Sequence, residues 1–102
     1  MKKLVVLFNL KAETDMQEYE NWAKTVDIPT AGGLPSIDNF EVVKSLSLFG
    51  SDATPPYQYI EILSINDLDQ LGNDVSSDEM QKVAAQFQAF ADNPMFILTE
   101  NI

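Results

Sequence analysis

A carboxylate stands in the middle of the segment "YQYIEILSI", residues 57–65, which is otherwise rich in aromatic and β-branched residues. Such a run is typical of a sheet strand. A carboxyl group partly removed from water has a raised pKa, so it can act as a general base or accept a hydrogen bond from a ligand. Glu61 is therefore the first candidate catalytic residue.

Lys44 is the second candidate, because it lies on the preceding apolar run. If "GSDATPP", residues 50–56, forms a hairpin loop, one register places Lys44 opposite Glu61, and a slip of one residue places Ser45 there instead. Two interpretations stay open. In the structural one, the two charged residues form an ion pair, or Glu61 lies at a solvent-exposed rim; in the functional one, they serve a ligand site.

Aromatic side chains could surround a ligand near this carboxylate. Rings usually fill a core, and that alternative stays open. However, the polar tips of Tyr and Trp need partners, and an apolar pocket with a few polar groups is typical of a small-molecule site. Asn9 can point into the same space, or it can mark the point where the first strand leaves the core. The candidate ligand-binding residues are Asn9, Tyr19, Trp22, Tyr57, Tyr59, Phe87 and Phe90.

The residue types that are missing exclude much familiar enzyme chemistry. The 102 residues include no Cys, no His and no Arg, so disulfides, thiolate metal sites and Ser–His triads are excluded. The acidic segment "DLDQLGND" lacks the spacing of a calcium loop, so we expect no metal and no cofactor. Without Arg there is no bidentate clamp for phosphate or carboxylate groups, which favours an uncharged or weakly charged ligand.

The net charge of the chain also limits the partners that it can bind. Sixteen acidic and six basic residues give a net charge of −10, which repels nucleic acids and anionic membranes. No run approaches the ~20 apolar residues of a membrane helix. The start "MKKLVVLFNLK" imitates a signal peptide, but Asn9 and Lys11 interrupt its apolar run. We expect no nucleic-acid partner, no membrane association and a cytoplasmic protein.

The positions of apolar residues predict one domain over residues 1–102. Thr14, with Gln17 three residues later, resembles a capping box, and Asn93-Pro94 should end the second long helix. Residues 28–39 should form a connecting loop. The expected elements are a strand at 3–10, a helix at 13–27, strands at 40–49 and 57–65, a short helical turn within 66–74, a helix at 76–94 and a strand at 95–102.

This order predicts an α+β, ferredoxin-like βαββαβ fold with a four-stranded antiparallel sheet and both long helices on one face. Yet the first strand has apolar residues on both faces, with Val6 and Phe8 on one side and Val5 and Leu7 on the other. Monomers rarely expose a wide apolar patch. We therefore expect a homodimer in which two sheets pack face to face.

Five segments resemble the RedY-like, HapK-type proteins of prodigiosin-type pigment pathways: "LVVLFNLK", "YENWAKTVDIPT", "IDNFEVVKS", "YQYIEILSINDLD" and "MQKVAAQFQAFADNPMFILTE". The resemblance spans nearly the whole chain. It implies a dimeric α+β barrel, as in EthD-like proteins and antibiotic-biosynthesis monooxygenases.

The same resemblance implies an accessory protein or cofactor-free oxidoreductase that acts on an aromatic intermediate, bipyrrole or polyketide-like. Two alternatives stay open. A non-catalytic protein could bind or carry a hydrophobic intermediate, and a purely structural interaction protein would bind no such compound.

Overall fold

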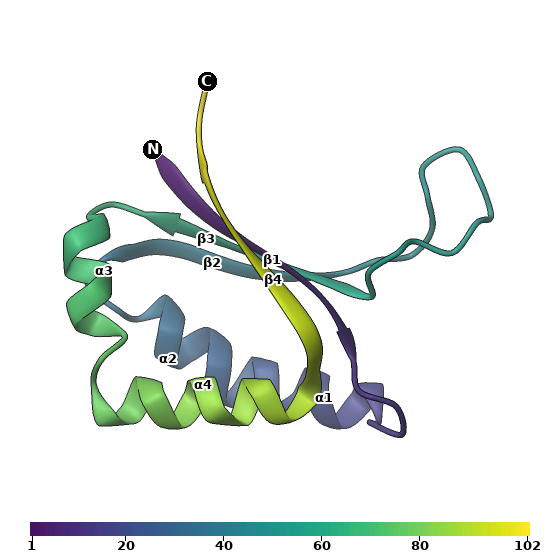
Figure 1. Ribbon diagram of the computed structural model, residues 1–102, viewed down its shortest axis with the longest axis horizontal. Helices are drawn as coiled ribbons and strands as arrows, with labels where there is room; N and C mark the ends of the chain where they lie inside the picture. Colours follow the sequence, from purple (N-terminus) through teal and green to yellow (C-terminus); the bar gives the residue numbers. More distant parts are fainter.

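The computed structural model describes residues 1–102, in which four strands form one antiparallel sheet and all helices lie on one side of it (Figure 1). The strand order is β2-β3-β1-β4, so β1 and β3 are central. This confirms the predicted ferredoxin-like fold. The elements are β1 (Lys2–Leu10), α1 (Met16–Trp22), the π-helical segment η1 (Ala23–Asp27), α2 (Ile28–Gly32), β2 (Ile37–Lys44), β3 (Tyr59–Ile65), α3 (Leu68–Asp74), α4 (Asp78–Phe90) and β4 (Ala91–Glu100).

The two faces of the sheet differ in burial. Along β3, residues at every second position from Tyr59 to Ile65 are buried under the helices, whereas Ile60 and Ile62 between them are only half-buried. The same alternation continues on β1, because successive side chains of a strand point to opposite faces. The helix-free face is therefore apolar and uncovered within one chain.

The first helical region is longer than the sequence pattern predicts. Residues 28–39 are not simply a loop, because α2 continues the helical path to Gly32 before β2 begins at Ile37. The N-cap also differs: Asp15, and not Thr14, accepts a hydrogen bond from the backbone N–H of Gln17 at 3.1 Å. Asp adjoining Thr is an equally good cap, so the capping-box spacing selected the wrong one of two neighbours.

The π-helical turn η1 controls which side chains of this region face the sheet. The buried residues along α1, η1 and α2 are spaced by four: Tyr19, Ala23, Asp27 and Ala31. In a regular α-helix, with about 100° per residue, this spacing drifts by about 40° at each step. A wider π turn reduces the drift. Pro29 gives a physical reason for it, since proline lacks an N–H and clashes with the carbonyl four residues earlier.

The second long helix begins at Asp78, within the predicted range of 76–94, and it ends earlier than predicted. Ser77 caps α4 by accepting a hydrogen bond from the N–H of Met80 at 3.2 Å. The helix ends at Phe90, and β4 begins at Ala91 instead of residue 95. Asn93 has a φ of 47°, so the chain turns before Pro94 while it is already beside β1. No helix is long and apolar enough to span a membrane.

The predicted register of the hairpin is wrong. Val42 lies opposite Glu61, and Lys44 lies opposite Tyr59. The strands also separate earlier than expected, so that residues 45–58 form an arm that extends beyond the sheet (Figure 1). The turn chemistry of residues 50–56 correctly located the connection but did not reveal how early pairing stops.

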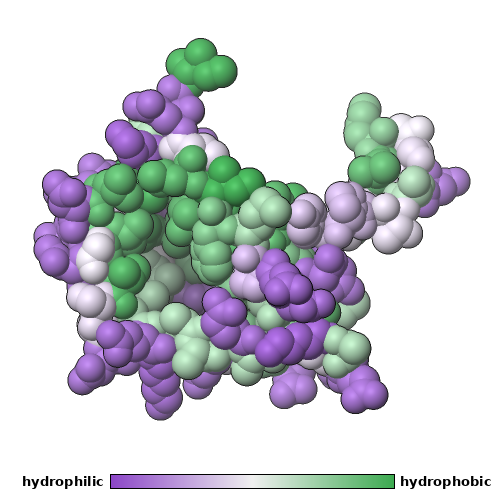
Figure 2. Space-filling model, viewed as in Figure 1, coloured by the Kyte–Doolittle hydropathy of each residue, from purple (hydrophilic) through white to green (hydrophobic).

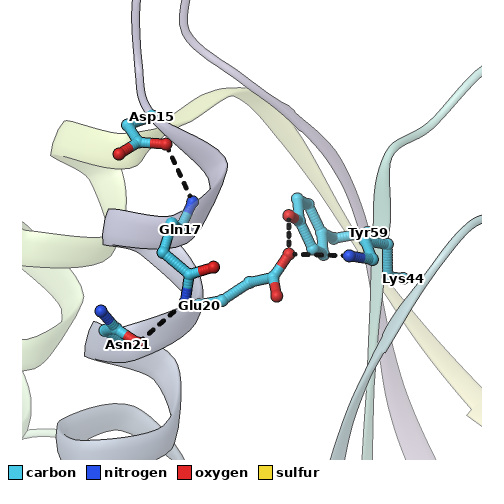
Figure 3. A network of polar contacts seen from close by, with 6 residues as sticks. All are labelled: Asp15, Gln17, Glu20, Asn21, Lys44 and Tyr59. Atoms are coloured by element: carbon cyan, nitrogen blue, oxygen red, sulfur yellow. Dashed lines mark hydrogen bonds and ion pairs between the residues drawn. The ribbon is translucent and has the colours of Figure 1, made fainter.

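Lys44 consequently has a different partner from the one predicted. Its ammonium lies 3.2 Å from the carboxylate of Glu20 on α1, which also accepts a hydrogen bond from the hydroxyl of Tyr59 at 2.7 Å (Figure 3). These contacts hold the pKa of Glu20 below its usual range, chiefly through the bond from Tyr59. The network ties α1 to β2 and β3.

We expect Tyr59→Phe to lower the free energy of unfolding by about 1 kcal/mol, because the variant loses one hydrogen bond to a charged group while the ring stays packed. Urea denaturation followed by circular dichroism measures this. The control is Tyr57→Phe, whose hydroxyl makes no hydrogen bond within the chain, and it should leave stability nearly unchanged. Equal effects in both variants would contradict this account of the network.

Candidate functional site

A cavity of about 190 Å³ lies between the sheet and the helices α2, α3 and α4. Thirteen of its sixteen lining residues are hydrophobic. Val6 and Leu63 of the sheet form part of its floor, and Val83 and Phe87 of α4 form part of the opposite wall. Figure 2 shows a hollow between the sheet and the helix layer, with hydrophobic side chains above it on the sheet side. The space suits a small apolar compound.

Glu61 stands in this apolar wall. Glu61 is on β3, where it pairs with Val6 of β1 and with Val42 of β2, and it is only 6% exposed. Its Oε2 atom is buried without a hydrogen-bond partner. An unpaired buried acceptor is costly. A carboxyl group in this position is therefore available to a group that enters the cavity.

Asp27 is the nearest titratable partner of Glu61. It also lines the cavity, it is 6% exposed, and the π-helical turn directs it toward the sheet. Burial raises the pKa of Glu61 to about 9, and the Asp27 charge and the hydrogen bond to Asp27 add to that rise. Burial also raises the pKa of Asp27 to about 6, although the bond with Glu61 opposes the rise.

These shifts describe two carboxyl groups that share a proton. Two like charges cannot both form at short range in an apolar environment, so one member stays protonated and donates to the other. The hydrogen bond that joins the two groups raises the pKa of Glu61 and lowers that of Asp27, so the shared proton is held between the two carboxyl groups. Near neutral pH the pair can accept one proton or release one.

Tyr19 extends this polar cluster into the core. Its side chain is fully buried and its hydroxyl has no partner. Burial raises its pKa, and the charges of Glu61 and Asp27 raise it further, so the phenol stays neutral. Tyr19 does not line the cavity itself. It lies behind the carboxyl pair as a neutral hydroxyl.

Most of the aromatic residues named from the sequence pack together outside the cavity. Phe8 is central, with ring contacts to Tyr19, Tyr59 and Phe87 at centroid distances of 5.5, 5.7 and 4.9 Å. Of the predicted ligand-binding residues, Phe87 lines the cavity and the others do not. Their proposed contact with a ligand stays a prediction.

Trp22 and Phe90 pack at the outer side of this aromatic cluster, with their rings 5.3 Å apart. The indole N–H of Trp22 donates to the Oε1 atom of Gln86 at 3.1 Å, which satisfies its polar tip. Neither residue lines the cavity. The arrangement suits a structural contact between α1 and α4.

Asn9 and Tyr57 lie at the base of the arm formed by residues 45–58. The side chain of Asn9 donates to the carbonyl of Pro56 at 3.0 Å and accepts from the N–H of Gln58 at 2.9 Å. Tyr57 lines a separate, smaller hollow beside the arm. The geometry gives Asn9 a role in fixing the arm to β1.

Asp27 is the site residue that the sequence pattern did not reveal. The predicted helix ended at this residue, and no role was expected for its side chain. Tyr19, Ala23 and Asp27 are spaced by four, but a regular helix spreads them over an arc of about 80°, which puts Asp27 at the edge of the face that contains Tyr19. The π-helical turn narrows this arc.

The comparisons with known proteins agree with this fold. A family model described as REDY-like protein HapK matches residues 2–102. The crystal structure of HapK from Hahella chejuensis is 23% identical, with a TM-score of 0.78 over 100% of this chain and 93% of that one. No curated protein matches the sequence.

Two other solved structures share the fold at lower identity. A dimeric ferredoxin-like protein of unknown function from Thermobifida fusca is 11% identical, with a TM-score of 0.77 over 98% of this chain and 90% of that one. An antibiotic biosynthesis monooxygenase is 12% identical, with a TM-score of 0.73 over 100% and 99%. The match of the family model over nearly the full length shows that this chain belongs to the REDY-like HapK family.

Proposed function

We propose that this protein binds a planar aromatic intermediate of prodigiosin-type secondary metabolism in the cavity, and that it acts on it as an accessory protein or a cofactor-free oxidoreductase. The observation that carries the proposal is the buried, unpartnered Oε2 atom of Glu61 in an apolar wall. Membership of the HapK family supports the pathway class. The fold shared with an antibiotic biosynthesis monooxygenase supports an oxidative reaction.

The carboxyl pair supplies the chemistry in this proposal. A pyrrole or phenol that enters the cavity gives its N–H or O–H proton to the Glu61–Asp27 pair. The resulting electron-rich anion can pass an electron to dioxygen without flavin or metal, and the apolar walls exclude water from the reacting ring. We propose a cytoplasmic setting for this reaction.

A non-catalytic carrier is the second candidate. The chain has no His, no Cys and no Arg, and the hydrophobic lining of the cavity is sufficient to hold an apolar compound by burial alone. In this case the carboxyl pair only orients the ligand through a hydrogen bond. The two candidates differ in whether the compound changes chemically.

We also propose that a second copy of the chain covers the helix-free face of the sheet. That face presents apolar residues from all four strands, which form one row from Val43 through Ile60 and Leu7 to Met95, and Glu41 lies beside Ile62 on the edge strand. The similar Thermobifida fusca protein is described as dimeric, and sheet-to-sheet pairing is symmetric, as most homodimers are. Exposed or half-buried side chains on this face are Val5, Leu7, Val43, Ile60, Ile62, Met95 and Ile97.

The cavity assignment is tested with 2,2′-bipyrrole as the probe and isothermal titration calorimetry as the measurement. Ala84 lines the cavity mouth on α4, whereas the adjacent Ala85 is equally exposed and does not line it. We expect Ala84→Phe to weaken binding by about tenfold or more, because the added ring occupies the entrance. Ala85→Phe should bind as the unmodified protein does. Equal affinities in both variants would place the ligand elsewhere.

The same compound separates the enzyme from the carrier. In air, an enzyme changes the absorbance spectrum of 2,2′-bipyrrole slowly, and Glu61→Gln abolishes the change because the amide cannot take up a proton at one atom while it releases another to Asp27. A spectrum that stays constant while binding persists identifies the carrier. Circular dichroism of Glu61→Gln shows whether the fold is retained.

The carboxyl pair also predicts how stability depends on pH. Folding raises the pKa of Glu61 to about 9, so the native state holds a proton that the unfolded chain releases near pH 4.5. The stabilisation is complete below that pH, and it is lost as the pH rises toward 9. Because the chain has no His and no Cys, few other groups titrate between pH 6 and 9.

We therefore expect the free energy of unfolding in urea to decrease from pH 6 to pH 9, and Glu61→Gln to flatten this decrease. A pKa raised by one unit corresponds to about 1.4 kcal/mol, so the difference between the two curves measures the shift. Glu79→Gln, an exposed control on α4, should keep the unmodified slope. A flat curve for the unmodified protein would contradict the shared proton.

The proposed dimer is tested by light scattering after size exclusion. Ile62→Lys places a charge at the centre of the apolar face, so we expect it to shift the mass from two chains to one at the same concentration. Gln81→Lys adds the same charge on the exposed side of α4 and should remain dimeric. A monomeric unmodified protein would refute this arrangement.

A further inference from the structure

The cavity holds acidic groups without a basic partner, and we propose that it takes a planar aromatic cation with N–H donors, such as an amidinium or a protonated nitrogen heterocycle. Glu61 and Asp27 then act as the counter-ion of the ligand. This inference rests on the proposed function, because it names the class of compound that the same cavity binds. A cation that gives its N–H proton to the pair leaves a neutral ring, which takes the place of the anion formed from a pyrrole or phenol.

The charged residues that line the cavity are all acidic. Asp27 and Glu61 are the charged residues that line the cavity, and no Lys lines it. Lys44, the base expected from the sequence, is instead paired with Glu20 of α1, and neither residue lines the cavity. When the carboxyl pair shares one proton, it keeps one negative charge in an apolar wall, and a buried charge without a partner is costly.

Glu61 also has a buried hydrogen-bond acceptor without a donor. Glu61 is 6% exposed, and its Oε2 atom has no donor within the chain. An N–H on a cation would supply both the missing donor and the missing positive charge, in a charge-assisted hydrogen bond that is stronger than a neutral one. The third polar lining residue, Gln88, carries no charge.

The size of the cavity and the net charge of the protein further limit the class of ligand. A cavity of about 190 Å³ is smaller than the roughly 300 Å³ at which sites for drug-sized ligands begin, so one or two rings fit. The net charge of −10 attracts cations from solution and repels anions. This revises the expectation of an uncharged or weakly charged ligand, because the carboxyl pair was not visible in the sequence.

Few groups control the charge of this site as the pH changes. Asp27 faces Glu61 from the helical side, and Tyr19 lies behind both with a raised pKa that keeps it neutral. The remaining lining residues from β1, β2, β4, α3 and α4 do not titrate. Between pH 5.5 and 7.5 the main change is therefore the loss of a proton from the pair, with Asp27 having a pKa of about 6.

Three compounds of nearly the same shape test the proposal: benzamidine is a cation, benzamide is neutral and benzoate is an anion. Calorimetry at pH 7.5 and low salt should show benzamidine binding at least about tenfold more tightly than benzamide, with benzoate weakest. Asp27→Asn should remove most of the preference for benzamidine over benzamide, because Asp27 is the member of the pair that is ionised at this pH. Glu79→Gln removes one negative charge from an exposed position and should keep the preference.

The outcomes separate the two proposals. Equal affinities for benzamidine and benzamide would overturn the cation proposal and leave the aromatic cavity standing. Absence of binding by all three compounds would overturn both.

If Asp27→Asn does not fold, the unmodified protein still provides a test. Its affinity for benzamidine should increase roughly fourfold from pH 5.5 to pH 7.5, as Asp27 loses its proton, while its affinity for benzamide stays constant. A benzamidine affinity that does not change with pH would overturn the proposal.

Discussion

The proton shared between Glu61 and Asp27 is the interaction on which the site depends. It joins the central strand β3 to the π-helical turn η1 across the edge of the cavity. Two ionised carboxylates in this apolar environment would repel each other and lack solvent, so the fold can hold them together only while one stays protonated. The chemistry proposed for the protein and a cost to its stability arise from the same pair of side chains.

The sheet divides the molecule into two functional surfaces. The face under the helices contains the aromatic cluster around Phe8 and, beside it, the cavity. The aromatic cluster is closely packed and leaves no room for a ligand, whereas the cavity is lined mainly by aliphatic side chains. The other face has no helix over it and is apolar, so it suits association with another chain. The site and the proposed association surface are therefore separated by the thickness of one sheet.

Much of the fold was predictable because it depends on patterns of short range. Runs of apolar and β-branched residues marked the strands, Ser76 and Ser77 before an acidic turn marked the start of α4, and the order of elements indicated the ferredoxin-like topology. The register of β2 against β3 was not predictable in the same way, since the length of the arm between them leaves the pairing free to shift. In the observed register, Lys44 is two residues away from the position opposite Glu61.

The site was predictable only in part for a related reason. Glu61 was visible because a single acid interrupts an apolar strand. Asp27 was hidden because its burial depends on a departure from regular helical geometry, and no local pattern of apolar residues announces that departure. The unpartnered atoms of Glu61 and Tyr19 are likewise properties of three-dimensional packing.

The π-helical turn has a consequence for comparing members of the family. A turn of this kind holds one more residue than the α-helical turn it replaces, so a relative that lacks the extra residue keeps the same helix while its acid is rotated by about 100° away from the sheet. At 23% identity, an alignment can place its gap on either side of Ala23–Asp27 with little penalty. The residue of a homologue that corresponds to Asp27 must therefore be identified by superposing the backbones. A matching position in a sequence alignment is not sufficient.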